Sequence, residues 1–143
     1  MQGLLALVTV LAAAPVSAKE SLDKVCAIYG DAMKAHPKSA LDAHKAIVAK
    51  GEALIAPLRK LAPKAPREDY DRAIDAIAAT GWHRAVVGAL APYLLGDPAD
   101  HEFLWSGLAK DEKVEGWSCP AMKAHDAAVK ADRKRDPKLW DSL

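Results

Sequence analysis

Apolar residues recur every three or four positions along most of the chain, a spacing that places them on one face of an α-helix. The clearest stripe covers residues 22–35, where Ser21 is positioned to cap the first turn. Similar stripes cover residues 39–51, 53–61, 66–81, 83–95, 98–108 and 120–133, although Pro57 should kink or shorten the second of these. We therefore predict an all-α fold of five to six short amphipathic helices in antiparallel hairpins.

Prolines and glycines mark the expected ends of these helices. Pro37 should end the first helix, and Ser39 with Asp42 three residues later resembles a capping box for the next one. Gly51 and Gly81 are further predicted stops because glycine readily adopts the backbone conformation that ends a helix. Pro66 should occupy the first position of the helix that Gly81 ends.

The second half of the chain carries comparable signals. Residues 96–98 (Gly-Asp-Pro) supply a break, a cap and a first-turn proline, while the charged run 110–115 predicts a loop. Pro120 should open the last long helix. The residues expected to point inward near the end of the chain are Phe103, Leu104, Leu108, Leu139 and Trp140, the last two as an apolar clasp.

Two stretches share a layout in which a glycine is followed by an alanine, two apolar residues and a leucine. The first stretch contains Gly51, Ala53, Leu54, Ile55 and Leu58, and the second contains Gly81, Ala85, Val86, Val87 and Leu90. A third, less complete copy of the layout contains Gly116, Trp117, Ala121 and Met122. This layout resembles HEAT-like helical repeats within residues 46–129. The resemblance implies a short solenoid of stacked hairpins; the alternative is an irregular helical bundle whose helices look alike because they obey the same packing rules.

The beginning of the chain has the pattern of an export signal. An apolar run over residues 4–16 is too short to span a bilayer comfortably and ends in Val16-Ser17-Ala18, the small-x-small pattern of a cleavage site. No lysine or arginine precedes this run, so an uncleaved membrane anchor is the alternative. We expect cleavage after Ala18, which leaves residues 19–143 as one exported domain, soluble in the periplasm or outside the cell and without integral membrane association.

Cys26 and Cys119 follow the predicted cleavage site, and an even number of cysteines in an exported chain predicts a disulfide. Cys26 lies on the apolar face of the first predicted helix, while Cys119 directly precedes the proline that opens the last one. The bridge would therefore join the two ends of the domain.

Charge gives no indication of a polyanionic partner. The chain has 20 Lys and Arg residues against 19 Asp and Glu residues, so no strong field favours nucleic acid or an anionic membrane. Asparagine is absent, which excludes N-glycosylation and, together with the export signal, favours a bacterial source.

The sequence offers no clear catalytic or cofactor motif. The five histidines are scattered, and no two stand four residues apart as paired zinc ligands on a helix would. No C-x-x-C motif is present, which excludes a thioredoxin-type centre and covalent haem. Cys119, Met122 and His125 suit copper by residue type, but steps of three residues spread them over about 120° of a helix. We therefore expect no metal and no cofactor.

The leading hypothesis is an exported, non-catalytic module that binds a protein partner. Trp82, His83 and Arg84 form the candidate interaction surface, because an aromatic ring beside two potentially cationic groups at a helix terminus suits an acidic or aromatic partner. Trp82 could instead cap the hairpin core. Two other functions stay open: a small-ligand carrier with a pocket between helices, and an enzyme in which Trp82, His83, Asp100 and His101 converge.

Overall fold

The computed structural model describes residues 15–95 and 101–141, and every regular element in these ranges is a helix. The helices are α2 (Ala18–Ala35), α3 (Ala40–Leu54), α4 (Ala56–Arg59), α5 (Arg67–Ala78), α6 (Arg84–Leu95), α7 (His101–Asp111), α8 (Pro120–Arg135) and α9 (Pro137–Trp140). The all-α prediction is confirmed. The count exceeds the predicted five to six because two single turns of four residues count as helices: α4, which lies within the predicted stripe 53–61, and α9.

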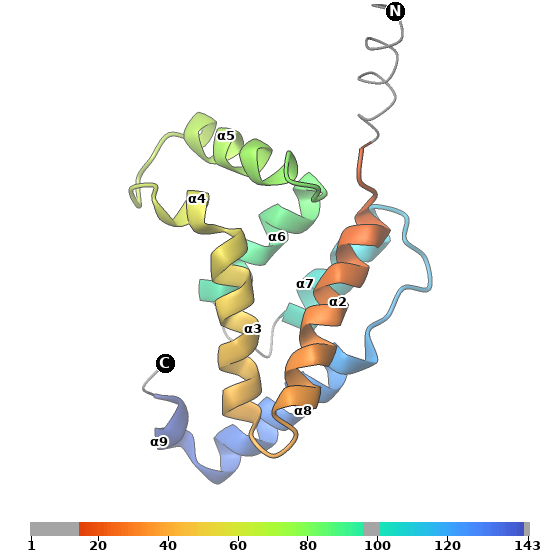
Figure 1. Cartoon of the computed structure of the whole chain (residues 1–143), viewed down its shortest axis with the longest axis vertical. Helices are drawn as coiled ribbons and strands as arrows, with labels where there is room; N and C mark the ends of the chain where they lie inside the picture. Colours follow the sequence, from red (N-terminus) through yellow and green to blue (C-terminus); the bar gives the residue numbers. More distant parts are fainter. Residues whose placement is uncertain (1–14, 96–100, 142–143) are drawn as a thin grey trace, which may run out of the picture.

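The helices pack as a bundle with a smaller group attached at one end (Figure 1). Helices α2 and α3 form an antiparallel hairpin, and α8 packs against both of them. At the far end of α3 the chain turns into α4, α5 and α6, which contact one another in succession before α7 leads back to the bundle. None of the described helices is both long enough and apolar enough to cross a membrane.

Helix α2 begins four residues earlier than its predicted start at Leu22. The side chain of Ser17, and not that of Ser21, caps the helix by accepting a hydrogen bond from the Glu20 N–H at 3.2 Å. Ser21 is instead fully buried and accepts a hydrogen bond from the backbone N–H of His83 at 2.9 Å. The predicted cap was wrong because a long-range contact takes the Ser21 hydroxyl.

Helix α3 has the predicted cap but not the predicted end. The Ser39 side chain accepts a hydrogen bond from the Asp42 N–H at 3.1 Å, as the capping-box pattern indicated. Gly51 does not stop the helix; it is buried inside α3, where an added Cβ would lie 3.0 Å from the Leu94 side chain. Gly51 thus permits close packing, whereas Gly81 has a φ of 105° and forms the turn between α5 and α6. The two glycines of the HEAT-like layout therefore occupy different structural positions, and the likeness to these repeats stays a prediction.

Helix α7 buries a different face from the one predicted. Its buried residues are His101, Trp105 and Ala109, whereas Phe103 is 81% exposed and Leu104 is 36% exposed. Leu108 packs against the core as predicted, whereas Phe103 and Leu104 do not. The prediction missed that His101, Trp105 and Ala109, each four residues from the next, share the buried face. The predicted break at residues 96–98 lies outside the described residues.

The end of the chain closes the fold much as expected. Cys119 caps α8, its sulfur accepting a hydrogen bond from the Met122 N–H at 3.4 Å, and it forms a disulfide with Cys26 of α2. In α9 the Trp140 indole is buried and donates a hydrogen bond to Asp132 at 2.8 Å, while Leu139 is 40% exposed. The clasp is therefore made by Trp140, and its partner is a carboxylate of α8.

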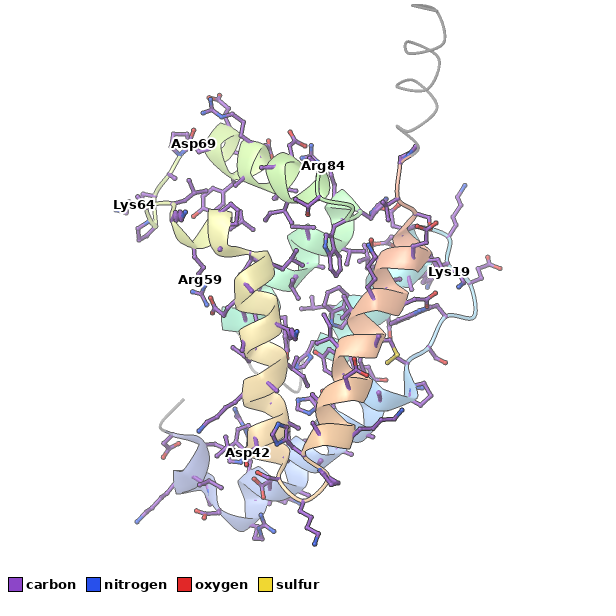
Figure 2. The ribbon with its side chains drawn as sticks, viewed as in Figure 1. Lys19, Asp42, Arg59, Lys64, Asp69 and Arg84 are labelled. Carbon is purple, nitrogen blue, oxygen red and sulfur yellow. A yellow bond between two sulfur atoms is a disulfide. The ribbon has the colours of Figure 1, made fainter. Side chains whose placement is uncertain are left out.

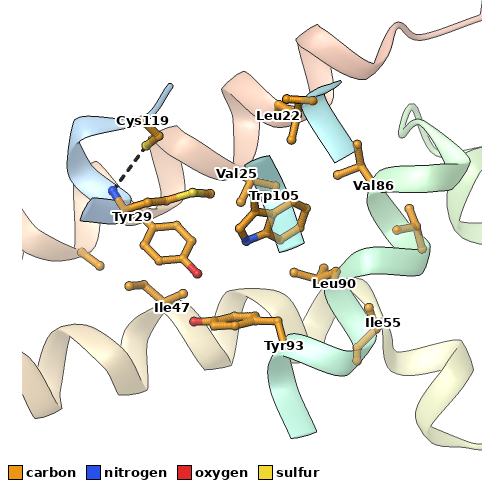
Figure 3. Packing of buried hydrophobic residues seen from close by; sticks show 14 of the residues in the cluster. Leu22, Val25, Tyr29, Ile47, Ile55, Val86, Leu90, Tyr93, Trp105 and Cys119 are labelled. Atoms are coloured by element: carbon orange, nitrogen blue, oxygen red, sulfur yellow. Dashed lines mark hydrogen bonds between the residues drawn. The ribbon is translucent and has the colours of Figure 1, made fainter. Parts of the chain in front are cut away.

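One apolar core connects most of the helices. Its members include Leu22 and Val25 of α2, Ile47 of α3, and Trp105 of α7 (Figure 3). Burial of these side chains is the main favourable contribution to folding, on the order of 1.5–3 kcal/mol for each large apolar residue.

Candidate functional site

The clearest binding site is an apolar groove between the short helices at the end of α3. Its volume is about 550 Å³. The lining residues come from the end of α3, from α4, from the connection that follows, and from α5 and α6: Ile55, Leu58, Arg59, Leu61, Pro63, Tyr70, Ile74, Gly88, Ala91 and Pro92. Eight of these ten residues are apolar or glycine, so the groove favours an apolar occupant.

Proline and glycine positions shape this groove. Pro57 lies in the first turn of α4, directly after α3 ends at Leu54, so the chain changes direction between the two helices. Pro63 lies in the connection to α5, which the Tyr70 hydroxyl ties down by donating a hydrogen bond to the Ala62 carbonyl at 3.4 Å. On the opposite wall Gly88 contributes no side chain, which leaves space between α5 and α6.

A single charged side chain lies at the rim. Arg59 projects from α4 (Figure 2) and forms a two-point ion pair with Glu52, in which its Nε lies 3.0 Å from Oε2 and its Nη2 contacts Oε1. Both side chains are more than a third exposed, so solvent weakens the pair. Because Glu52 already neutralises Arg59, the groove carries no strong preference for an anionic ligand.

A second polar feature lies inside the bundle, where three histidines from three helices meet. His44 of α3 and His125 of α8 stack with ring centroids 5.4 Å apart, and Nδ1 of His44 lies 3.3 Å from Nε2 of His125. His101 of α7 hydrogen-bonds through Nδ1 to the Tyr29 hydroxyl and lies 3.8 Å from Asp126 through Nε2. All five side chains are buried, and we call them the buried histidine cluster.

Burial controls the protonation of this cluster. It lowers the pKa of His44 and of His125 to about 4, with a further reduction from Arg133 on His44 and from His44 on His125. Burial and the two neighbouring histidines lower the pKa of His101 to about 2. Burial also raises the pKa of Asp126 to about 7, helped by Glu102 and opposed by Lys130. The three histidines are therefore neutral near neutral pH, where Asp126 is close to half-protonated.

These pKa values link stability to pH. Between about pH 4 and 6.5 the unfolded chain binds up to three more protons at the histidines, while the folded chain binds one more at Asp126. The net uptake on unfolding is about two protons, so stability falls as the pH drops through this window. Since each proton contributes a little over 1 kcal/mol per pH unit, the slope is on the order of 2–3 kcal/mol per pH unit.

The buried histidine cluster is a structural feature of the core and offers no access to a substrate. His101 is 1% exposed and His125 is fully buried. Tyr29 and Tyr93 pack against the His101 ring, and Figure 3 shows these two tyrosines together with Trp105 in the core. Within the described ranges no three histidine, cysteine or carboxylate side chains are arranged to hold a metal ion.

The predicted interaction surface has contacts within the fold at each of its three residues. Trp82 is half-buried against the core, and the Lys24 ammonium lies 4.9 Å from its ring centroid. His83 accepts a hydrogen bond from the Ala85 N–H through Nδ1 at 3.3 Å, which is a helix cap for α6. The third residue, Arg84, is exposed and pairs with Asp75 and, at 3.9 Å, with Asp71 of α5. These contacts favour the alternative in which Trp82 covers the hairpin core.

A larger and more polar hollow of about 710 Å³ lies near His83, between the start of α2 and residues 112–118. Ser17 and Ala18 form part of its wall, together with Lys19, Asp23 and Trp117. The predicted cleavage after Ala18 would remove part of that wall. We therefore base the functional argument on the apolar groove, which contains no residue near the predicted cleavage site.

The enzyme hypothesis required Trp82, His83, Asp100 and His101 to converge. His83 contacts Ser21 and Glu112, with 3.8 Å between its Nε2 and the Glu112 carboxylate, whereas His101 contacts Tyr29 and Asp126. The two histidines thus lie in different surroundings, and Asp100 lies outside the described residues.

Comparison with protein families, with curated protein sequences and with solved structures gave no match. The function is therefore argued from the groove alone.

Proposed function

We propose that this protein is a non-catalytic binding module that holds one small apolar molecule in the groove between α4, α5 and α6. The observation that carries the proposal is an apolar hollow of about 550 Å³ in a chain of this size. Small-molecule sites usually have volumes of about 300–1,000 Å³ and are lined mainly by apolar side chains with a few polar groups. Both properties hold here.

A small molecule suits this groove better than a protein surface does. Ile55 at the junction of α3 and α4, Leu58 of α4 and Ile74 of α5 lie around the hollow, so an occupant of modest size contacts several walls at once. The hypothesis of a protein partner at Trp82, His83 and Arg84 remains a prediction, and the carrier function that the sequence left open becomes the leading one.

We place this activity in an oxidising compartment outside the cytoplasm. The Cys26–Cys119 disulfide supports this placement because such bridges persist in exported proteins and are rare in reducing compartments. The export signal predicted for residues 1–18 agrees with it. An exported protein with a small apolar site is suited to carry or sequester a poorly water-soluble compound.

The test is binding of N-phenyl-1-naphthylamine, a neutral apolar dye that becomes fluorescent when it leaves water. Burying about 250 Å² of dye surface at ~25 cal/mol/Å² gives about 6 kcal/mol, which corresponds to a Kd on the order of tens of micromolar. We expect one dye to bind per chain.

Two matched variants locate the binding. Gly88→Phe places a ring in the groove, whereas Gly107→Phe adds the same ring to an exposed position of α7, and neither glycine has an atom within 4 Å of an added Cβ. Both substitutions replace a helical glycine, so neither should prevent folding. Gly88→Phe should weaken dye binding at least tenfold and Gly107→Phe should not. Equal binding by both variants, or no binding by the natural chain, would overturn the proposal.

A further inference from the structure

One wall of the groove contains a helical backbone position that lacks its usual hydrogen-bond donor. Pro92 lies inside α6, and proline has no N–H. In an α-helix the N–H of residue 92 would donate to the carbonyl of residue 88, four positions earlier. The carbonyl oxygen of Gly88 is therefore without its α-helical donor.

This carbonyl lies on the groove side of the helix. Gly88 and Pro92 are four residues apart, which places them on the same helical face, and both line the groove. Gly88 is exposed and lines the groove, so its backbone is accessible from the groove, and the Pro92 ring beside the carbonyl tilts that end of the helix away from it. A ligand in the groove can approach the oxygen directly.

The polar side chains that line the groove already have partners. Tyr70 donates its hydroxyl hydrogen to the Ala62 carbonyl, and Arg59 is paired with Glu52. The Gly88 carbonyl thus adds a hydrogen-bond acceptor to a wall that is otherwise apolar. An exposed acceptor that a ligand covers lowers the free energy of binding only for a ligand that carries a donor, because other ligands displace water from the oxygen without replacing its hydrogen bond.

From this geometry we infer that the groove selects apolar molecules that carry one hydroxyl or N–H donor, such as a phenol, an indole or an aromatic amine. The inference rests on the proposed function and specifies its ligand class. The Gly88 carbonyl accepts the donor hydrogen, and the aliphatic walls hold the rest of the molecule. One neutral hydrogen bond of ordinary strength corresponds to a preference of about 2- to 13-fold.

The experiment compares three ligands of the same ring system: 2-naphthol, 2-methoxynaphthalene and naphthalene. Each displaces N-phenyl-1-naphthylamine from the full chain with its disulfide intact, and the three affinities are compared. We expect 2-naphthol to bind about 3- to 10-fold more tightly than either of the others. Because the hydroxyl makes naphthol the more water-soluble compound, transfer from water alone would give the opposite order.

Pro92→Ala tests whether the Gly88 carbonyl makes this distinction. Alanine at position 92 restores the N–H and the helical hydrogen bond, so the carbonyl is no longer free to accept from a ligand. Because Pro92 also lines the groove, the readout is the ratio of the affinities for 2-naphthol and naphthalene, which should fall to one or below in the variant. Its helix content, measured by circular dichroism, should not fall, because alanine favours the helix more than proline does.

The outcomes separate the inference from the proposed function. If none of the three ligands displaces the dye, the inference is overturned, while the proposed function is decided by the dye binding itself and by its loss in Gly88→Phe. If all three bind equally well, the groove is a binding site without selection for a donor, and the inference is overturned while the proposed function stands. If Pro92→Ala keeps the preference for 2-naphthol, another group accepts the donor and the inference is likewise overturned.

Discussion

Removal of the Cys26–Cys119 disulfide should strongly destabilise the fold. The bridge joins α2 to the start of α8, two elements that are 93 residues apart in sequence, with 5.8 Å between their Cα atoms. A suitable variant is Cys26→Ala with Cys119→Ser. Serine at position 119 keeps a side-chain acceptor for the Met122 N–H, so the cap of α8 is retained while the bridge is lost.

The expected magnitude follows from the length of the closed loop. In the chain-entropy model, closing a loop of 93 residues lowers the entropy of the unfolded chain enough to stabilise the fold by about 4.6 kcal/mol at 25 °C. Folded domains have a total stability of about 5–15 kcal/mol, so the variant should lose a large fraction of it. The unfolded chain also becomes less compact, which should increase the dependence of the unfolding free energy on denaturant.

Equilibrium unfolding in urea, followed by circular dichroism, measures both quantities. We expect the variant to be less stable by about 3–5 kcal/mol with a larger m-value, and the natural chain in the presence of a reductant to behave like it. A loss below about 1 kcal/mol with an unchanged m-value would refute the reasoning, since the bridge would then not restrict the unfolded chain.

Three further predictions concern the buried histidine cluster, the candidate interaction surface and the start of α2. Stability in urea should fall from about pH 7 towards pH 4.5, because His44, His101 and His125 must stay neutral in the folded chain; a flat profile would contradict this. His83→Ala with Arg84→Ala should cost about 1 kcal/mol through the lost cap and leave dye binding unchanged, and in-cell crosslinking would show whether it loses a protein partner. A chain that begins at Lys19 should be about 1 kcal/mol less stable to heat than one that begins at Pro15, because it lacks the Ser17 cap; equal stability would show that this cap contributes nothing.

The sequence allowed the helices to be predicted because their signals are local. Ser39 with Asp42, Gly81 and Pro120 act within one turn of the helix end that they mark, and each has the predicted role. The disulfide was predictable because only two cysteines are available. Ser21 was assigned wrongly because its hydroxyl binds a residue 62 positions away, a contact that no local pattern reveals.

The candidate site could be predicted only in part. The buried histidine cluster depends on contacts across 72 and 81 residues, so histidines that look scattered in the sequence meet in the core. The groove depends on how α4 and α5 pack against α6, which apolar periodicity does not determine. Its acceptor, however, had a local signal: Gly88 and Pro92 stand four residues apart inside a predicted helix, a spacing that leaves a carbonyl without its donor.

Methyl NMR during a titration with 2-naphthol tests the central claim most directly, because it shows where the ligand binds. With isoleucine and leucine methyl groups labelled, the resonances of Ile55, Leu58 and Ile74 in the groove should shift and saturate at one ligand per chain. Those of Leu22 and Ile47 in the centre of the bundle should stay in place. Shifts confined to residues outside the groove, or no saturable shift at all, would contradict the account.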